Sequence, residues 1–156
     1  MAREIERKFL IHKDHPGFSQ ALEVAPMQIR QGYISSDPER TIRVRQLGNQ
    51  GFLTIKGPKV GIEGDEFEYE IPLKDAQSML DTMCETSLEK ERRFIPLAAG
   101  LTIELDYFPA IDLHLAEVEL PTIETEFVRP DWFAEEVSED PEYFNSRIAE
   151  RLSKQS

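Results

Sequence analysis

The sequence predicts an α+β domain built on an eight-stranded antiparallel β-barrel, with helices packed on the outside of the barrel. Eight segments alternate apolar and polar residues with a period of two, which is the pattern of a half-buried β-strand. Short, turn-rich stretches separate these segments and favour an antiparallel meander. The polar face carries charges of both signs, and a closed barrel lets such charges line a water-filled lumen while apolar residues face the helices.

Strands are predicted wherever this alternation is unbroken. The predicted ranges are 4–11, 28–35, 41–47, 51–56, 66–72, 89–95, 101–107 and 115–120. Turn signals such as Asp37-Pro38, Gly48-Asn49-Gln50-Gly51 and Gly57-Pro58 lie between them. Because these connections are short, consecutive strands are expected to pair with each other.

Four helical segments are predicted between and after the strands. Asp75 is expected to cap a helix whose apolar residues recur at helical spacing, namely Ala76, Met79, Leu80 and Met83. Asp140-Pro141-Glu142 predicts a second start, because it offers a cap, a proline at the first helical position and an acid in the first turn. This helix is expected to reach about residue 152 and to pack through Phe144, Ile148 and Leu152. Shorter helical pieces are predicted at 18–24 and 131–135.

Composition excludes several classes of protein. The 156 residues fit one domain spanning 1–156. The net charge of −12 argues against DNA or RNA as the main partner, because nucleic-acid binding relies on a basic surface. No stretch approaches the roughly 20 apolar residues of a membrane span, and the N-terminus reads as a charged strand, so a cytoplasmic protein with no membrane partner is expected. The single cysteine, Cys84, cannot form an intramolecular disulfide.

Charged residues on the alternating faces form two groups. The basic group contains Lys8, Arg43, Arg45, Lys56, Lys90 and Arg92. The acidic group contains Glu4, Glu6, Glu66, Glu68, Glu70, Glu104, Asp106, Glu117 and Glu119. Basic side chains hold phosphate oxygens, and carboxylates bind hard divalent cations that also coordinate those oxygens. The lumen is therefore predicted to bind a polyanion together with divalent metal ions.

Six motifs in a fixed order resemble a known family. They are Glu4-Ile5-Glu6-Arg7-Lys8-Phe9, Arg43-Val44-Arg45, Lys56 within Leu-Thr-Ile-Lys-Gly, Glu68-Tyr69-Glu70, Lys90 with Arg92, and Glu117-Val118-Glu119. Over nearly the whole chain they resemble the CYTH superfamily, the triphosphate tunnel metalloenzymes. The closing segment 136–145 is similar to the end of the compact bacterial members. The resemblance implies an eight-stranded antiparallel tunnel that binds a triphosphate with Mg²⁺ or Mn²⁺ and cleaves it.

The resemblance also implies roles for individual residues. One metal ion would be held by Glu4, Glu6 and Glu119, with Asp106 and Glu117 as further ligands. The triphosphate clamp would consist of Lys8, Arg43, Arg45, Lys56, Lys90 and Arg92. Further lumen acids would be Glu68, Glu70 and Glu104.

Two features depart from the family pattern. Arg93 stands where members usually show an aromatic residue after the clamp arginine, and Phe94 is displaced by one position, so the register of that strand stays open. Glu66 extends the pair of glutamates that the family needs, and it is expected to face solvent.

The expected reaction is metal-dependent hydrolysis of inorganic tripolyphosphate to pyrophosphate and orthophosphate. Phosphoryl transfer mainly requires positioning and charge neutralisation, so a covalent nucleophile is not needed. Lys90, with a pKa lowered by nearby cations and an orientation set by Tyr33, is predicted as the general base, and Lys56 is the alternative. Hydrolysis of thiamine triphosphate, an adenylate cyclase on the same fold and a non-catalytic sensor of polyphosphate or nucleotide remain open, as does a homodimer.

Overall fold

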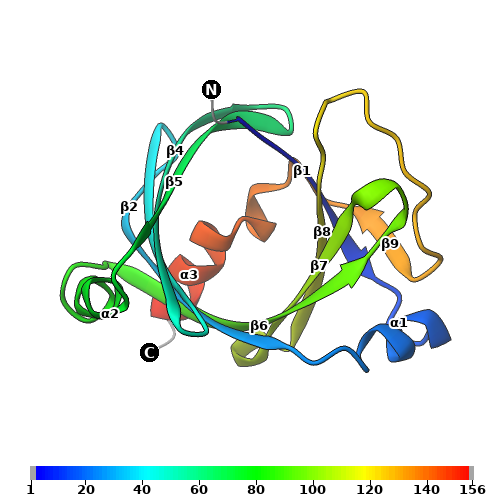
Figure 1. Cartoon of the computed structure of the whole chain (residues 1–156), viewed down its shortest axis with the longest axis horizontal. Coiled ribbons are helices and arrows are strands. Elements are labelled where there is room, and N and C mark those ends of the chain that lie inside the picture. Colours follow the sequence, from blue (N-terminus) through cyan, green and yellow to red (C-terminus); the bar gives the residue numbers. More distant parts are fainter. Residues whose placement is uncertain (1–2, 155–156) are drawn as a thin grey trace.

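The strands form one antiparallel sheet that closes on itself, as Figure 1 shows for a computed structural model in which residues 3–154 are described. The order around the barrel is β5-β4-β3-β2-β6-β7-β8-β1, and pairing of β1 with β5 completes the ring. The predicted eight-stranded barrel is therefore confirmed. Its strands are β1 (Arg3–Ile11), β2 (Met27–Asp37), β3 (Arg40–Leu47), β4 (Gln50–Val60), β5 (Glu63–Ile71), β6 (Thr86–Pro96), β7 (Thr102–Phe108) and β8 (Leu113–Glu119).

The strand register brings charged residues of neighbouring strands opposite each other. Lys8 of β1 lies opposite Glu117 of β8, and Lys56 of β4 lies opposite Glu66 of β5. Because side chains alternate between the two faces of a strand, these charged residues all point to the inside of the barrel. The register thus creates the charged lumen that the alternation predicts.

The apolar residues on the outer face are covered by helices and loops. Helix α2 (Leu73–Thr82) packs Ala76 and Leu80 against Val44 of β3. Helix α1 (Pro16–Ala21) and the segment around Trp132 cover Phe9, Leu105 and their neighbours on β1, β7 and β8. Short 3₁₀ turns flank β7: η1 (Ala98–Gly100) precedes it, and η2 (Pro109–Ile111) joins it to β8.

Helix α3 (Asn145–Lys154) is placed differently from the other two helices. It packs Ile148 and Ala149 against Tyr33, Leu88, Phe108 and Leu115, which lie on the lumen-facing side of their strands. In Figure 1, α3 accordingly lies within the outline of the ring of strands. The lumen face is therefore charged along one part of the barrel and apolar where α3 meets it. The prediction of helices on the outside holds for α1 and α2, and α3 differs from it.

Residues 131–135 do not form the predicted helix. The chain forms instead a short strand, β9 (Phe133–Glu136), which pairs with the second half of β1. The physical reason is that β5 covers only the first half of β1 and leaves a free edge beyond it. Phe133 stacks on Phe9 with ring centroids 4.7 Å apart, and Glu136 pairs with Arg7 at 2.6 Å.

Two helix starts also differ from the prediction. Asp140 accepts a hydrogen bond from the amide nitrogen of Glu142, but it caps only a 3₁₀ turn, η3 (Pro141–Tyr143). Phe144 is then extended, so α3 begins at Asn145. Helix α2 begins after Pro72, which places Asp75 in its first turn and not at the cap. Within residues 3–154, none of the helices combines the length and the apolar content needed to cross a membrane.

Candidate active site

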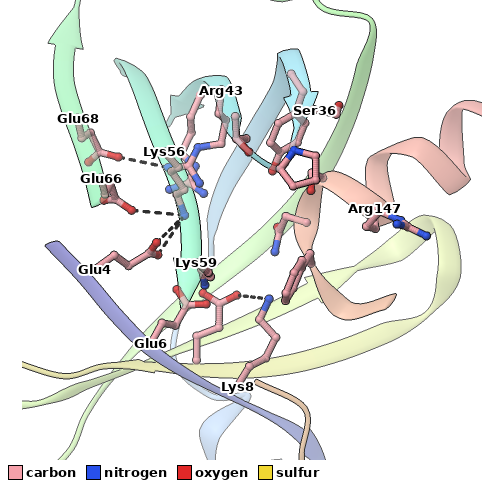
Figure 2. A pocket seen from close by; sticks show the side chains of 18 of the residues that line it. Glu4, Glu6, Lys8, Ser36, Arg43, Lys56, Lys59, Glu66, Glu68 and Arg147 are labelled. Carbon is pink, nitrogen blue, oxygen red and sulfur yellow. Dashed lines mark hydrogen bonds and ion pairs between the residues drawn. The ribbon is translucent and has the colours of Figure 1, made fainter. Parts of the chain in front are cut away.

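The lumen contains a cavity of about 440 Å³ whose walls are mostly charged (Figure 2). Every member of the predicted clamp lines it: Lys8, Arg43, Arg45, Lys56, Lys90 and Arg92. The acids that line it are Glu4, Glu6, Glu66, Glu68, Glu104, Glu117 and Glu119. Residues from β1, β3, β4, β5, β6, β7 and β8 thus meet in one space.

Lys56 is held between two carboxylates on one side of the cavity. Its ammonium lies 3.0 Å from Glu4 and 3.4 Å from Glu66 (Figure 2). Burial alone would raise the pKa of Glu4, but the charges of Lys56 and Lys59 outweigh burial and lower this pKa to about 2. Burial would lower the pKa of Lys56, yet Glu4 raises it, so Lys56 stays protonated. Glu66 points into the lumen, which corrects the expectation that it faces solvent.

Glu6 and Glu119 face each other across β1 and β8. Burial together with the charges of Glu117 and Glu4 raises the pKa of Glu6 to about 8. Burial together with Glu66 and Glu104 raises the pKa of Glu119 to about 7. This part of the lumen therefore holds more carboxyl groups than its own cations can keep ionised.

Glu117 is surrounded by cations on the neighbouring strands. Lys8 approaches it to 3.4 Å and Arg92 to 3.5 Å. Burial opposes ionisation of Glu117, but the charges of Lys8 and Arg92 outweigh it and hold the pKa of Glu117 well below its usual value. Lys8 also donates to the backbone carbonyl of Tyr143 at 2.8 Å, which ties it to the segment before α3.

Asp106 is fully buried beneath the cavity and does not line it. Its carboxylate accepts hydrogen bonds from Lys90 at 2.7 Å and from Arg92 at 2.7 and 2.9 Å. Both oxygens are therefore already engaged by cations. The geometry makes Asp106 an anchor for Lys90 and Arg92, and it does not support the prediction that Asp106 is a metal ligand.

Lys90 combines deep burial with a lowered pKa. Burial is the main cause, and Arg92 and Arg45 add to it, so that the pKa of Lys90 falls to about 7 despite the nearby charge of Asp106. Its nitrogen also donates to Oδ1 of Asn145 at 2.7 Å. Tyr33 lines the cavity, but its hydroxyl accepts from Gln31 at 3.1 Å. The predicted orientation of Lys90 by Tyr33 is thus replaced by contacts to Asp106 and Asn145.

The two arginines of β3 have different partners. Arg43 donates to Thr54 and Glu68, both at 3.2 Å, and Thr54 in turn donates to Glu68 at 2.8 Å. Arg45 donates to the neutral side chain of Gln31 at 2.9 Å. Burial, followed by the charges of Arg43 and Arg92, lowers the pKa of Arg45 to about 9. Arg45 therefore brings a cationic charge that no contacting carboxylate among residues 3–154 neutralises.

The structure also settles the strand register around Arg92. Arg92 points into the lumen, whereas Arg93 donates to the backbone carbonyl of Val24 on the outside. Glu104 lines the cavity and pairs with Arg92 at 2.7 Å. Glu70 is exposed and is absent from the cavity wall, so the expectation that it is a lumen acid is not supported.

Several residues at the cavity were not predicted from the sequence. Gln31 shares the lumen face of β2 with Tyr33, a spacing of two that could have indicated it. Lys59 and Asn145 also line the cavity. Their positions depend on a register shift in β4 and on the start of α3, and the sequence carries no local signal for either.

The donor set of the acidic side fits a hard divalent cation. Glu6 and Glu119 are carboxylates that face each other without an ion pair among the described residues, and carboxylate oxygens are the ligands that such cations prefer. Within residues 3–154 no three carboxylate, histidine or cysteine side chains are already grouped as a metal site. The side chains would therefore have to converge on the ion as it binds.

Comparison with known proteins places the chain among proteins of this architecture. It is 37% identical to an inorganic triphosphatase of Acetivibrio thermocellus, over 95% of this chain and 94% of that protein. It is 33% identical to an inorganic triphosphatase of Nitrosomonas europaea, over 94% of this chain and 96% of that protein. The crystal structure of an inorganic triphosphatase with 32% identity superposes with a TM-score of 0.63, covering 96% of this chain and 95% of that one. The model of the CYTH domain matches residues 2–151, and the chain belongs to the CYTH domain family.

Proposed function

We propose that this protein hydrolyses inorganic tripolyphosphate to pyrophosphate and orthophosphate in the barrel lumen. The observation that carries the proposal is the meeting of eight basic and seven acidic side chains in one cavity of about 440 Å³. A linear triphosphate with divalent cations carries charges that complement both groups. The two relatives of nearly equal length that bear the name inorganic triphosphatase support the same reaction.

The basic residues would bind the three phosphates. Arg45 is suited to this role because its guanidinium contacts a neutral amide and is free to pair with phosphate oxygens. Lys8, Arg43, Lys56 and Arg92 would exchange part of their ion pairing with carboxylates for contacts with the substrate. Positioning and charge neutralisation account for most of the catalysis that phosphoryl transfer requires.

Membership in the CYTH family implies a metal ion, and we propose Mg²⁺ or Mn²⁺. Glu6 and Glu119 would hold it, with Glu4 and Glu117 as further oxygen donors. When bound, the ion would polarise phosphoryl oxygens and lower the pKa of a coordinated water. Binding would also relieve the repulsion between the carboxylates that face each other across β1 and β8.

Lys90 would act as the general base. A base is most effective when its pKa lies near the working pH, and burial brings the pKa of Lys90 to about 7. Lys56 is less suited because Glu4 raises its pKa and keeps it protonated. Lys56 would therefore serve as a phosphate ligand.

The direct test measures phosphate release from tripolyphosphate, thiamine triphosphate and ATP in parallel, with an assay for cyclic AMP. We expect turnover to be fastest with tripolyphosphate and to stop in excess chelator. Fastest turnover of thiamine triphosphate, or formation of cyclic AMP from ATP, would replace the proposal with one of those activities. Binding of tripolyphosphate with Mg²⁺ but without turnover between pH 6 and 9 would indicate a sensor.

A further inference from the structure

Two amide side chains connect the phosphate side of the lumen to Lys90. Gln31 is fully buried on β2, and its Oε1 accepts from Arg45 Nε at 2.9 Å. Its Nε2 donates to Asn145 Oδ1 at 3.2 Å and to the hydroxyl of Tyr33 at 3.1 Å. Asn145 Oδ1 also accepts from Lys90 Nζ at 2.7 Å. One strand and the first residue of α3 thus supply a continuous link from Arg45 to Lys90.

The partners fix the orientation of both amides. A guanidinium offers only donors, so Gln31 must present its oxygen to Arg45 and its nitrogen to Asn145. Asn145 must then present its oxygen to Gln31. That oxygen is the atom that Lys90 contacts.

Asn145 and Asp106 together set the direction in which the Lys90 nitrogen can react. An amine nitrogen has three positions besides its bond to carbon. Asp106 Oδ2 occupies one at 2.7 Å and Asn145 Oδ1 occupies a second at 2.7 Å. Lys90 lines the cavity although its side chain exposes no surface to solvent, so the third position is the one that a water molecule or a phosphate in the cavity would have to reach.

We propose that Asn145 is a positioning residue for Lys90, that it acts through a neutral acceptor, and that Gln31 holds Asn145 in place. The proposal rests on the function proposed above, in which Lys90 takes a proton from the attacking water. A carboxylate at position 145 would make the same contact, but it would favour the protonated form of Lys90. The neutral amide holds the nitrogen in place without adding a second negative charge beside Asp106.

The groups around Lys90 make its protonation sensitive to such a charge. The ring of Phe108 lies 5.5 Å from its nitrogen, and Asn145 is the neutral group in hydrogen-bonding contact. Burial is the largest influence and lowers the pKa of Lys90 to about 7, within the range of an enzyme assay. The charged groups that act on it are Asp106 of β7, Arg92 of β6, Arg45 of β3 and Glu117 of β8.

The central test replaces Asn145 with aspartate, which keeps the size and an acceptor oxygen but adds a charge. In Asn145→Asp the acid limb of the kcat profile should move to higher pH by about one unit or more. Asn49→Asp is the matched control, because it makes the same substitution at an exposed residue between β3 and β4 that does not line the cavity. Its acid limb should move by less than half as much.

Asn145→Ala tests the positioning role separately. We expect kcat to fall on the order of tenfold to a hundredfold, since a small displacement of a catalytic group is costly, while KM stays within about threefold. A variant that only loses thermal stability, with kcat unchanged in the folded protein, would show that Asn145 merely anchors α3 and would overturn the proposal. An unchanged acid limb in Asn145→Asp, or an equal shift in Asn49→Asp, would overturn it as well.

The role of Gln31 is tested by Gln31→Glu, which keeps an oxygen for Arg45 and loses the donor to Asn145. We expect a lower kcat, and little further loss when Asn145→Ala is added, because both changes release the same contact. If the fold-losses of kcat in the two single variants multiply in the double variant, Gln31 does not act through Asn145 and drops out of the proposal.

An NMR titration of lysine side chains separates this inference from the proposed function. It follows the protonation of Lys90 without turnover, in wild type and in Asn145→Asp. A higher pKa in the variant supports the contact even if wild type fails to cleave tripolyphosphate, which would refute the proposed reaction alone. Equal Lys90 titrations in the two proteins refute the inference while leaving the reaction intact.

Discussion

Glu6 gives a pH dependence to the stability of the metal-free protein. Its pKa is raised from 4.5 to about 8 on folding, so between these values the folded state binds more protons than the unfolded state. The free energy of unfolding that Glu6 contributes is therefore lost as the pH rises from about 4.5 to about 8.

The substitution Glu6→Gln should remove this loss. In the presence of chelator, the melting temperature of wild type should fall relative to that of Glu6→Gln between pH 5 and pH 8. Thermal unfolding at several pH values measures the difference, and Glu70→Gln, on an exposed residue outside the cavity, should follow wild type. Parallel pH profiles for wild type and Glu6→Gln would show that folding does not raise the pKa of Glu6.

A matched pair of substitutions distinguishes which of the two lysines, Lys90 or Lys56, acts as the general base. Lys90→Arg keeps a positive charge but cannot release a proton, so kcat should fall about 10²- to 10⁴-fold while KM changes little. Lys56→Arg keeps the charge of a residue that is protonated throughout, and its kcat should fall much less. Wild-type kcat should rise with pH through about 7 as Lys90 loses its proton. A larger loss of kcat in Lys56→Arg than in Lys90→Arg would make Lys56 the general base and Lys90 the phosphate ligand.

At the scale of single elements, β3 presents two arginines with unequal partners. Arg45→Ala removes a charge that no contacting carboxylate neutralises, so it should weaken tripolyphosphate binding by about 1.5 to 3 kcal/mol with little loss of stability. Arg43→Ala also breaks the ion pair with Glu68. Because Glu68 is exposed and water can hydrate its carboxylate, this break should cost little stability. Calorimetric titration with tripolyphosphate and Ca²⁺ measures both. Normal affinity in folded Arg45→Ala would leave that arginine a purely structural role.

The alternation of apolar and polar residues predicted the strands well, because each strand packs an apolar face against the helices or loops outside the barrel. The lumen charges on β1, β3, β4, β6 and β8 followed directly from that period of two. Segments whose structure depends on distant partners were not predictable in the same way. Phe133 to Glu136 forms a strand only because β5 leaves half of β1 uncovered, and no local pattern in 131–136 reports that free edge.

The start of α3 was missed for a similar reason. Asp140-Pro141 is a good local start signal, but Phe144 leaves the helical conformation, and its ring lies 5.9 Å from Lys8 and 5.7 Å from Lys59. The same tertiary contacts decide that Asn145 reaches Lys90. Asp106 could be predicted as a lumen residue from alternation, but its burial between Lys90 and Arg92 depends on depth along the barrel, which a period of two does not encode.

At the scale of the whole molecule, binding of a ligand in the charged lumen can be measured as a gain in stability. A ligand that binds only the folded state adds about 2.7 kcal/mol at a hundredfold excess over Kd. For a domain of this size the melting temperature should rise on the order of 5 to 10 °C with tripolyphosphate and Ca²⁺ together. Each component alone, and pyrophosphate with Ca²⁺, should give smaller shifts. The absence of any shift at saturating concentrations would contradict a triphosphate site in the lumen.

The pairing of β1 has a consequence for the order of folding. β1 leaves the ribosome before its partners β5, β8 and β9, because all three lie later in the chain. The barrel therefore closes only after most of the chain has been synthesised, and such long-range pairing folds slowly. This closing step also buries Glu6 beside Glu117 and Glu4, so the cost of crowding these carboxylates should fall on the late stage of folding and not on the earlier hairpins. A divalent cation bound by these carboxylates should therefore change the rate at which the barrel closes, as well as the stability of the folded protein.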